Sequence, residues 1–247
     1  MEISPLTCTA LQLYSVVSGS NPKNLRLSLS NPLIQEDHLL ILLRNARITQ
    51  DIVELICEHH DWISSYRVQS AIVNCPKTPY TIGMRLIQLL FWHDLLKTAG
   101  NVRLSPRIRR AAENNLKNRI AEMSLGEKMS LARTCPRPLI GHLRGEKDLR
   151  VIAELLRNPQ LVEEDVVLMI NDEMTAHSVL VSIGRDYKWS VRYPVRLALV
   201  RNVRTPLHLA LSLVSKLKKQ DLEPLTHAPK TPELIRRAAE RILSGEY

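Results

Sequence analysis

The sequence has 247 residues, enough for one large domain or two small ones whose core needs no disulfide or metal. Hydrophobic residues make up 45%, which excludes a disordered chain, and the 8 glycines argue against a glycine-rich phosphate loop or a turn-rich β-sandwich. The net charge of +9 is compatible with a nucleic acid, an acidic protein or an anionic surface as partner, and does not choose among them.

Proline placement predicts where helices begin. Eight of the 14 prolines directly follow Ser, Thr or Asn, whose side chains cap the free N–H groups of a first helical turn. Apolar residues then recur at helical spacing, and strict alternation over a strand length is absent. We therefore predict about fourteen helices and no sheet. In chain order they cover 5–18, 33–44, 49–60, 64–74, 79–91, 106–123, 126–134, 137–144, 147–157, 161–171, 175–185, 190–201, 206–217 and 232–244.

Two further helix signals are local. Asp94 and Asp221 each precede a leucine, so we expect both to be N-caps of short helical turns rather than general bases. Ser124 and Glu127 have the spacing of a capping box, which predicts a helix start there.

An internal repeat is the most informative feature of the sequence. At a shift of 127 residues, 18 of the 55 positions from 62 to 116 are identical, including Trp62 with Trp189 and Thr78-Pro79 with Thr205-Pro206. The run Ile108 to Glu113 falls on Ile235 to Glu240. We predict a single domain that consists of an N-terminal cap at 1–30, a first repeat unit at 31–124, connecting helices at 125–157 and a second repeat unit at 158–247.

The string from Val195 to Pro206 resembles a HEAT-like or leucine-rich-repeat-variant unit, with valine–arginine, alanine, an asparagine turn and then Thr-Pro before a leucine helix. A first-unit version runs from Val68 to Pro79, and a weaker one from Val151 to Pro159. The resemblance implies an all-α, right-handed α-α solenoid of stacked antiparallel helix pairs. Only Cys8 lies near the N-terminus, so the iron–sulfur cysteine cluster of the leucine-rich-repeat-variant prototype is not expected.

The four cysteines are far apart and form no C-x-x-C pair, which argues against a metal site or a disulfide framework and favours reduced thiols in a cytoplasm. The cluster of Cys57, His59, His60 and Asp61 is metal-capable by residue type, but adjacent helical histidines point about 100° apart. We expect no metal or cofactor. Neither a secretory signal nor a membrane span is predicted.

Arginines are the best candidates for a binding surface. Stacked helices would align arginines that face away from the apolar stripe into a ridge that could bind acidic side chains or phosphates. A solvated face interleaved with glutamates is the alternative interpretation. The candidate binding residues are Arg109, Arg110, Arg192, Arg196, Arg201, Arg236, Arg237 and Trp189.

We therefore predict a non-catalytic protein-binding scaffold with a concave, arginine-bearing surface for an acidic partner. The alternative is a DNA-binding protein or a HEAT-like glycosylase for alkylated bases, in which Asp186 and Trp189 would share one site. Trp189 also has a packing interpretation, because Trp62 holds the same place in the first unit. The sequence specifies neither the partner nor the oligomeric state.

Overall fold

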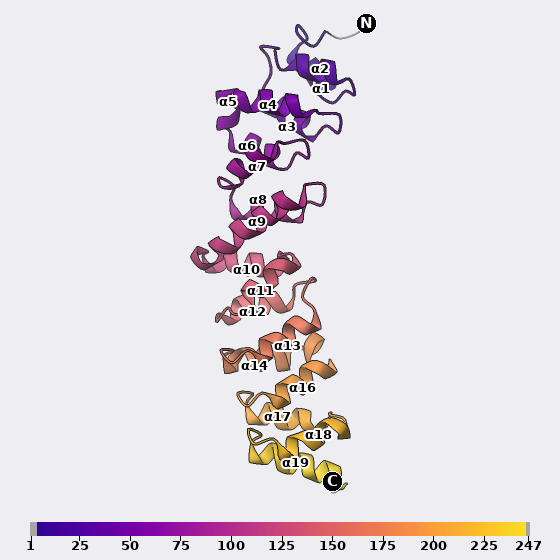
Figure 1. Ribbon diagram of the computed structural model, residues 1–247, viewed down its shortest axis with the longest axis vertical. Coiled ribbons are helices and arrows are strands. Elements are labelled where there is room, and N and C mark those ends of the chain that lie inside the picture. The colour runs from indigo at the N-terminus through magenta and orange to yellow at the C-terminus, as the bar shows by residue number, and fades with distance from the viewer. Residues whose placement is uncertain (1–3, 246–247) are drawn as a thin grey trace. The chain divides into compact units, whose positions relative to one another are not determined.

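The computed structural model describes residues 4–245 and divides the chain into two compact units, Met1–Ala121 (unit 1) and Glu122–Tyr247 (unit 2). Within the described residues there are nineteen α-helices, one 3-10 turn and no strand (Figure 1). The all-α prediction is therefore confirmed. The solenoid arrangement and the single-domain organisation stay predictions, and the outermost residues of the segments 1–30 and 158–247 lie outside the described part of the chain.

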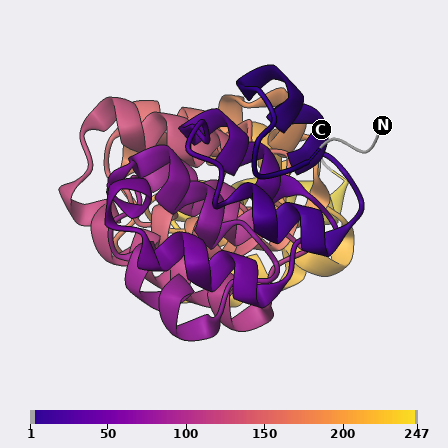
Figure 2. The ribbon, with the colours of Figure 1, turned by 90° about the horizontal axis from the view of Figure 1, so that it is seen from above.

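Unit 1 consists of short helices joined by tight turns, which Figure 2 shows from above in indigo to magenta. Helix α1 packs on α2 and α3, α3 packs on α6, α6 packs on α7, and α9 packs on α7 and α8. The helices are α1 (Ala10–Val17), α2 (Pro22–Ser28), α3 (Glu36–Arg44), α4 (Gln50–Glu58), α5 (His60–Ser64), α6 (Tyr66–Val73), α7 (Tyr80–Ile87), α8 (Trp92–Gly100) and α9 (Pro106–Arg119), followed by the 3-10 turn Ile120–Glu122.

Unit 2 has the same style of packing. Helix α12 packs on α10, α11 and α14, α13 packs on α16, and α19 packs on α17 and α18. The helices are α10 (Leu125–Thr134), α11 (Arg137–Leu143), α12 (Leu149–Leu156), α13 (Glu163–Asn171), α14 (His177–Arg185), α15 (Tyr187–Ser190), α16 (Tyr193–Arg201), α17 (Leu207–Val214), α18 (Lys219–His227) and α19 (Glu233–Ser244).

All fourteen predicted helices are present within a few residues of their predicted bounds. Helices α2, α5 and α15 are additional, and α8 and α18 stand where short helical turns were predicted around Asp94 and Asp221. The prediction that Asp94 and Asp221 are N-caps is wrong, because α8 and α18 begin earlier, with Phe91 and Lys218 at the capping positions. The cap acceptors come from other helices: the hydroxyl of Tyr66 accepts from the backbone N–H of Phe91, and the hydroxyl of Tyr193 accepts from that of Lys218.

Local capping follows the sequence at only some of the predicted starts. Of the eight Ser/Thr/Asn-Pro pairs, Asn21-Pro22 and Ser105-Pro106 cap α2 and α9 as predicted. Ser4-Pro5, Asn31-Pro32 and Asn158-Pro159 lie in turns, and in Thr78-Pro79, Thr205-Pro206 and Thr231-Pro232 the proline itself is the N-cap. Ser124 and Glu127 form the predicted capping box of α10, and Asn21 accepts from the N–H of Lys23 at α2. Thr78 behaves differently: its hydroxyl donates to the carbonyl of Ile72 at 2.5 Å, and Pro79 becomes the N-cap of α7. The Thr-Pro pair here fastens a turn to the preceding helix.

Buried asparagines show that the repeat reaches further towards the N-terminus than positions 62 to 116. Asn31 donates from Nδ2 to the carbonyls of Pro5 and Cys8, at 3.0 and 3.1 Å. Asn158, 127 residues later, donates to the carbonyls of Ala132 and Cys135, at 2.8 and 3.1 Å. The segment 125–157, predicted as connecting helices, therefore contains the counterpart of the turn at Pro5 and Cys8 and lies in unit 2.

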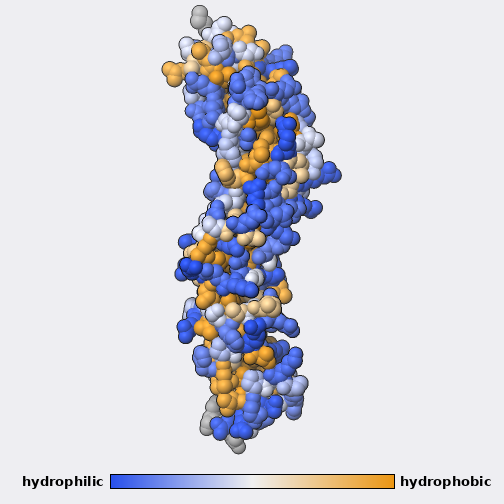
Figure 3. All heavy atoms as spheres, turned by 90° about the vertical axis from the view of Figure 1, so that its left-hand side faces the viewer, coloured by the Kyte–Doolittle hydropathy of each residue, from blue (hydrophilic) through white to orange (hydrophobic). Residues whose placement is uncertain are grey.

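The core of each unit is built from aliphatic side chains that face neighbouring helices, such as Leu39, Leu42 and Ile72 in unit 1 and Val166, Leu180 and Val195 in unit 2. Hydrophilic residues cover most of the visible face of both units, and apolar patches interrupt them (Figure 3). Among the described residues, no helix combines the length and hydropathy that a bilayer span requires.

Candidate functional site

A groove in unit 1, with a volume of about 1070 Å³, is a candidate site. Residues of α3, α6 and α8 and of the turns after these helices line it, and we call it the α3–α6–α8 groove. Its apolar part includes Leu40, Leu43 and Ala71. A groove with both apolar and polar lining is typical of a binding site, because it can bury apolar groups of a ligand and orient its polar groups.

Cations dominate the charged lining of the groove. Asp94 is the one carboxylate among the lining residues. Five basic residues line the groove: Arg44, Arg67, Lys77, Lys97 and Arg103. Arg67 is held by Glu36 at 2.6 Å and Asp37 at 3.2 Å, and Lys97 is held by Asp94 at 3.1 Å. Within residues 4–245, the other three cations form no ion pair, so their charge is uncompensated at the groove.

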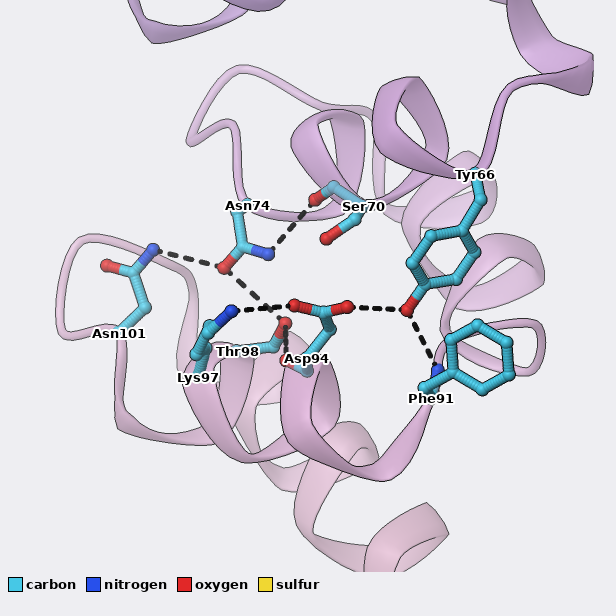
Figure 4. A network of polar contacts seen from close by, with 8 residues as sticks. All are labelled: Tyr66, Ser70, Asn74, Phe91, Asp94, Lys97, Thr98 and Asn101. Carbon is cyan, nitrogen blue, oxygen red and sulfur yellow. Dashed lines mark hydrogen bonds and ion pairs between the residues drawn. The ribbon is translucent and has the colours of Figure 1, made fainter.

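Tyr66 and Asp94 connect α6 to α8 beside this groove (Figure 4). The Tyr66 hydroxyl donates to Oδ2 of Asp94 at 2.5 Å and accepts from the N–H of Phe91 at 3.0 Å. Burial and the hydrogen bond to Asp94 raise the pKa of Tyr66 to about 12. Burial alone would raise the pKa of Asp94, but the hydrogen bonds from Tyr66 and Lys97 outweigh it and hold that pKa below its usual value. Asp94 is therefore a charged anchor within the protein.

Asparagine side chains shape the turns at the groove edge. Oδ1 of Asn74 accepts from the hydroxyl of Thr98 and from Nδ2 of Asn101, both at 3.4 Å (Figure 4). Oδ1 of Asn101 in turn accepts from the backbone N–H of Arg103 at 3.1 Å. This Asn-x-Arg turn fixes the backbone of Arg103, whose side chain is one of the three uncompensated cations.

The corresponding surface of unit 2 keeps the tyrosine–aspartate contact but has fewer free cations. Of the positions that match Arg44, Lys77 and Arg103, the first holds Asn171 and the second Arg204, and only Lys230 at the third is a cation without an ion pair among the described residues. The hydroxyl of Tyr193 donates to Oδ2 of Asp221. Arg201 of α16 lies 3.3 Å from Asp221, and Pro224 stands where Lys97 stands in unit 1. Arg204 donates to the carbonyl of Glu173. Its two arginines are therefore already engaged within the unit.

The predicted arginines lie on several helices, and most have partners in the chain. Arg109 and Arg110 are on α9 and do not line the α3–α6–α8 groove. In unit 2, Arg192 lies 3.6 Å from Glu163, and Arg196 donates to the carbonyl of Val191. Arg236 and Arg237 both pair with Glu233, at 3.3 and 2.8 Å, on α19.

Trp189 is 1% exposed, and its indole N–H donates to the carbonyl of Leu156 at 3.0 Å. Lys188 and Arg192 cover its ring, at 4.4 and 5.0 Å from the ring centroid. The carboxylate of Asp186 accepts from the N–H of Lys188 at 2.9 Å and caps α15. In this arrangement the ring of Trp189 is not available to stack on a ligand.

Sequence reasoning missed Arg44, Lys77 and Arg103. A signal was present for Arg103 alone, because Asn45-Ala46-Arg47, Asn101-Val102-Arg103 and Asn202-Val203-Arg204 repeat one turn pattern after a helix. The pattern marks a shared backbone turn. It does not tell which cation stays unpaired, since that depends on carboxylates from distant helices.

Metal and thiol chemistry find little support in the described residues. Within residues 4–245, no three His, Cys, Asp or Glu side chains gather as metal ligands would. His59 instead stacks on Trp62, with ring centroids 4.0 Å apart. Burial raises the pKa of Cys57 to about 11 and that of Cys135 to about 12, so both thiols are weak nucleophiles near neutral pH.

No protein-family model, curated protein or solved structure matches the chain. The HEAT-like resemblance therefore rests on the repeat motifs alone and stays a prediction.

Proposed function

We propose that this protein is a non-catalytic binding scaffold that holds an acidic segment of a partner protein in the α3–α6–α8 groove. The observation that carries the proposal is the set of three cations, Arg44, Lys77 and Arg103, which line one groove without an ion pair among the described residues. Carboxylates of a partner would form ion pairs with these cations, and the apolar part of the groove would cover the aliphatic portions of the same segment.

We further propose the finer architecture, a right-handed HEAT-like α-α solenoid. Its support is the 127-residue repeat, the recurrent asparagine turns and the packing of each helix on helices close to it in the sequence. In such an architecture, the turn-borne cations would line one continuous face of each unit.

The expected affinity is modest. Each exposed ion pair contributes about 0.2–1 kcal/mol, so measurable affinity for the partner segment needs several pairs and some apolar burial together. Because these contacts are solvent-exposed, binding should weaken as salt rises and the Debye length falls from about 10 Å at 0.1 M to about 3 Å at 1 M.

Fluorescence anisotropy tests the proposal, with a labelled 12-residue peptide of alternating glutamate and alanine as the probe. We expect the triple variant Arg44→Ala, Lys77→Ala, Arg103→Ala to bind about tenfold or more weakly than the wild type. The matched control is Arg107→Ala with Arg110→Ala and Lys117→Ala, three exposed cations of α9 that do not line the groove. Equal losses in both variants would show a diffuse charge effect and would overturn the groove as the site.

The DNA-binding alternative is tested in the same assay with a labelled 20-base-pair duplex. A duplex that binds more tightly than the acidic peptide, with an affinity that falls steeply with salt, would replace the present proposal. Asp186 and Trp189 give that alternative no open pocket with a stacking ring, because the first caps α15 and the second is buried.

A further inference from the structure

A second concavity, of about 610 Å³, lies between α12 and α14 in unit 2, and we call it the α12–α14 cleft. Small side chains create it: Ala153 comes from α12, and Ser178 and Ser182 come from α14. Leu156 and Val181 supply apolar wall. The backbone of Leu156 is fixed by the indole N–H of the buried Trp189, which gives the cleft a rigid side.

Two arginines line the cleft. Arg157 is exposed and lies 3.0 Å from Glu154, so its charge is partly compensated. Arg185 is exposed at the end of α14 and forms no ion pair within residues 4–245. The one carboxylate among the lining residues, Asp186, is occupied as the cap of α15. The cleft therefore joins an apolar hollow to an uncompensated positive charge.

In unit 1 the helices at the matching positions, α2 and α4, carry charged side chains where the α12–α14 cleft is apolar or small. At the positions of Ala153 and Ser178 it has Arg26 and Asp51, whose side chains approach to 3.6 Å across α2 and α4. Glu54 and Glu58 stand at the positions of Val181 and Arg185. An ion pair and two acids in unit 1 thus correspond in unit 2 to a hollow, an aliphatic wall and a cation.

We propose that the α12–α14 cleft is a binding site for a partner segment that presents an aliphatic side chain next to a carboxylate. The aliphatic group would enter the hollow beside Leu156 and Val181, and the carboxylate would pair with Arg185. The charge of Arg185 selects an acidic neighbour, and the small side chains leave room for the apolar group. The inference is independent of the α3–α6–α8 groove, which lies in the other unit and has different residues.

The test uses the full chain with methyl-labelled leucine and valine, and a synthetic helical peptide that carries leucine and glutamate four residues apart. Two-dimensional methyl NMR reports on each site separately. We expect the Leu149, Leu156 and Val181 methyl signals to shift saturably below about 1 mM peptide, with a concentration dependence of their own that is separate from any shift of the Leu40 and Leu43 signals of the groove. Binding should weaken as salt rises.

Unit 1 supplies the variants. Ala153→Arg with Ser178→Asp installs the unit 1 ion pair in the cleft and should abolish the shifts. Arg185→Glu leaves the hollow intact and should weaken binding about tenfold or more, which keeps the test sharp should the double variant fold poorly. The reciprocal control, Arg26→Ala with Asp51→Ser, opens unit 1 but leaves Glu54 and Glu58 in place, so no new site is expected there.

Three outcomes would overturn the proposal: no saturable shift at the cleft methyls, shifts unchanged in both cleft variants, or shifts confined to Leu40 and Leu43. The last outcome would support the groove of unit 1 while removing the cleft. Loss of groove binding with intact cleft shifts would do the reverse, so the two sites stand or fall separately.

Discussion

The tyrosine–aspartate contact occurs in both units, whereas the charges around it differ. In unit 1 the carboxylate of Asp94 is satisfied by Lys97 of its own helix, and the neighbouring cations of the groove remain free. In unit 2 Arg201 of α16 reaches Asp221 instead. The same tyrosine–aspartate hydrogen bond between helices is therefore compatible with an open basic groove in one unit and with internally paired arginines in the other.

A second contrast concerns the tryptophans at matching positions. Trp189 is 1% exposed and hydrogen-bonded to Leu156, whereas Trp62 is half-buried and stacks on His59. Sequence identity at a repeat position thus fixes the place of a side chain, and the neighbouring helices decide how much it contributes to stability.

The largest expected effect follows from this contrast. Trp189→Ala should lower the free energy of unfolding by about 3–5 kcal/mol, because it empties a buried site and leaves the carbonyl of Leu156 without its donor. Trp62→Ala should cost about 1–2 kcal/mol, because that ring is already partly exposed to water. Urea denaturation followed by far-ultraviolet circular dichroism measures both. Equal losses would contradict the packing difference between the units.

Buried asparagines should give the next largest effect. Asn31→Ala and Asn158→Ala each remove an amide that serves two buried carbonyls, and each should cost about 2 kcal/mol. Asn101→Ala is the control, with an expected cost below about 1 kcal/mol, because its amide contact is 3.4 Å long and its bond from the N–H of Arg103 is exposed to water. The same denaturation assay applies. A loss at Asn31 but none at Asn158 would show that the two turns are not equivalent.

These residues also show how far the sequence reaches. The capping box of Ser124 and Glu127 was predictable because both partners lie within one helical turn. The role of Asp94 was not, because its helix begins with an acceptor from Tyr66, 25 residues before Phe91. A local pattern contains the capping geometry of its own helix but not the side chains that folding brings from another.

The candidate sites depend on distant partners even more. The sequence reveals an excess of arginine, yet it cannot tell Arg201, which pairs with Asp221, from Arg103, which has no ion pair among the described residues. The α12–α14 cleft follows from small residues such as Ala153 and Ser178, which carry no functional signal until the facing helix is known.

Removal of the tyrosine hydroxyl should have an intermediate effect. Tyr66→Phe should cost about 1 kcal/mol at neutral pH, because the N–H of Phe91 and the carboxylate of Asp94 both lose a partner. Tyr193→Phe is the matched variant and should behave alike. An unchanged free energy of unfolding in Tyr66→Phe would show that water fully replaces the hydroxyl as hydrogen-bond partner.

The same hydroxyl predicts an alkaline pH dependence. The pKa of Tyr66 is raised to about 12 in the folded protein, above the ordinary value of 10.0. Its contribution to stability is therefore complete below pH 10 and is lost as the pH rises through about 12, because the unfolded chain releases that proton first. Unfolding free energies measured between pH 9 and 12 should fall less steeply in Tyr66→Phe than in the wild type. Parallel curves would contradict the assigned hydrogen bond.

The smallest expected effect comes from the cations that differ between the units. Lys97→Ala and Arg201→Ala each remove one exposed partner of an aspartate, and each should cost about 0.2–1 kcal/mol.

For Asp94 the folded pKa lies below 3.8, so its stabilisation is complete above that pH and is lost as the pH falls through the folded value. Lys97→Ala weakens one hydrogen bond that depresses this pKa, so it should shift the onset of acid unfolding upwards. Asp94→Asn is the control, because without a titrating carboxylate the effect of Lys97→Ala on that onset should vanish in the double variant. Acid titrations monitored by circular dichroism give the comparison, and an unchanged effect in the Asp94→Asn background would show that Lys97 acts through a different partner.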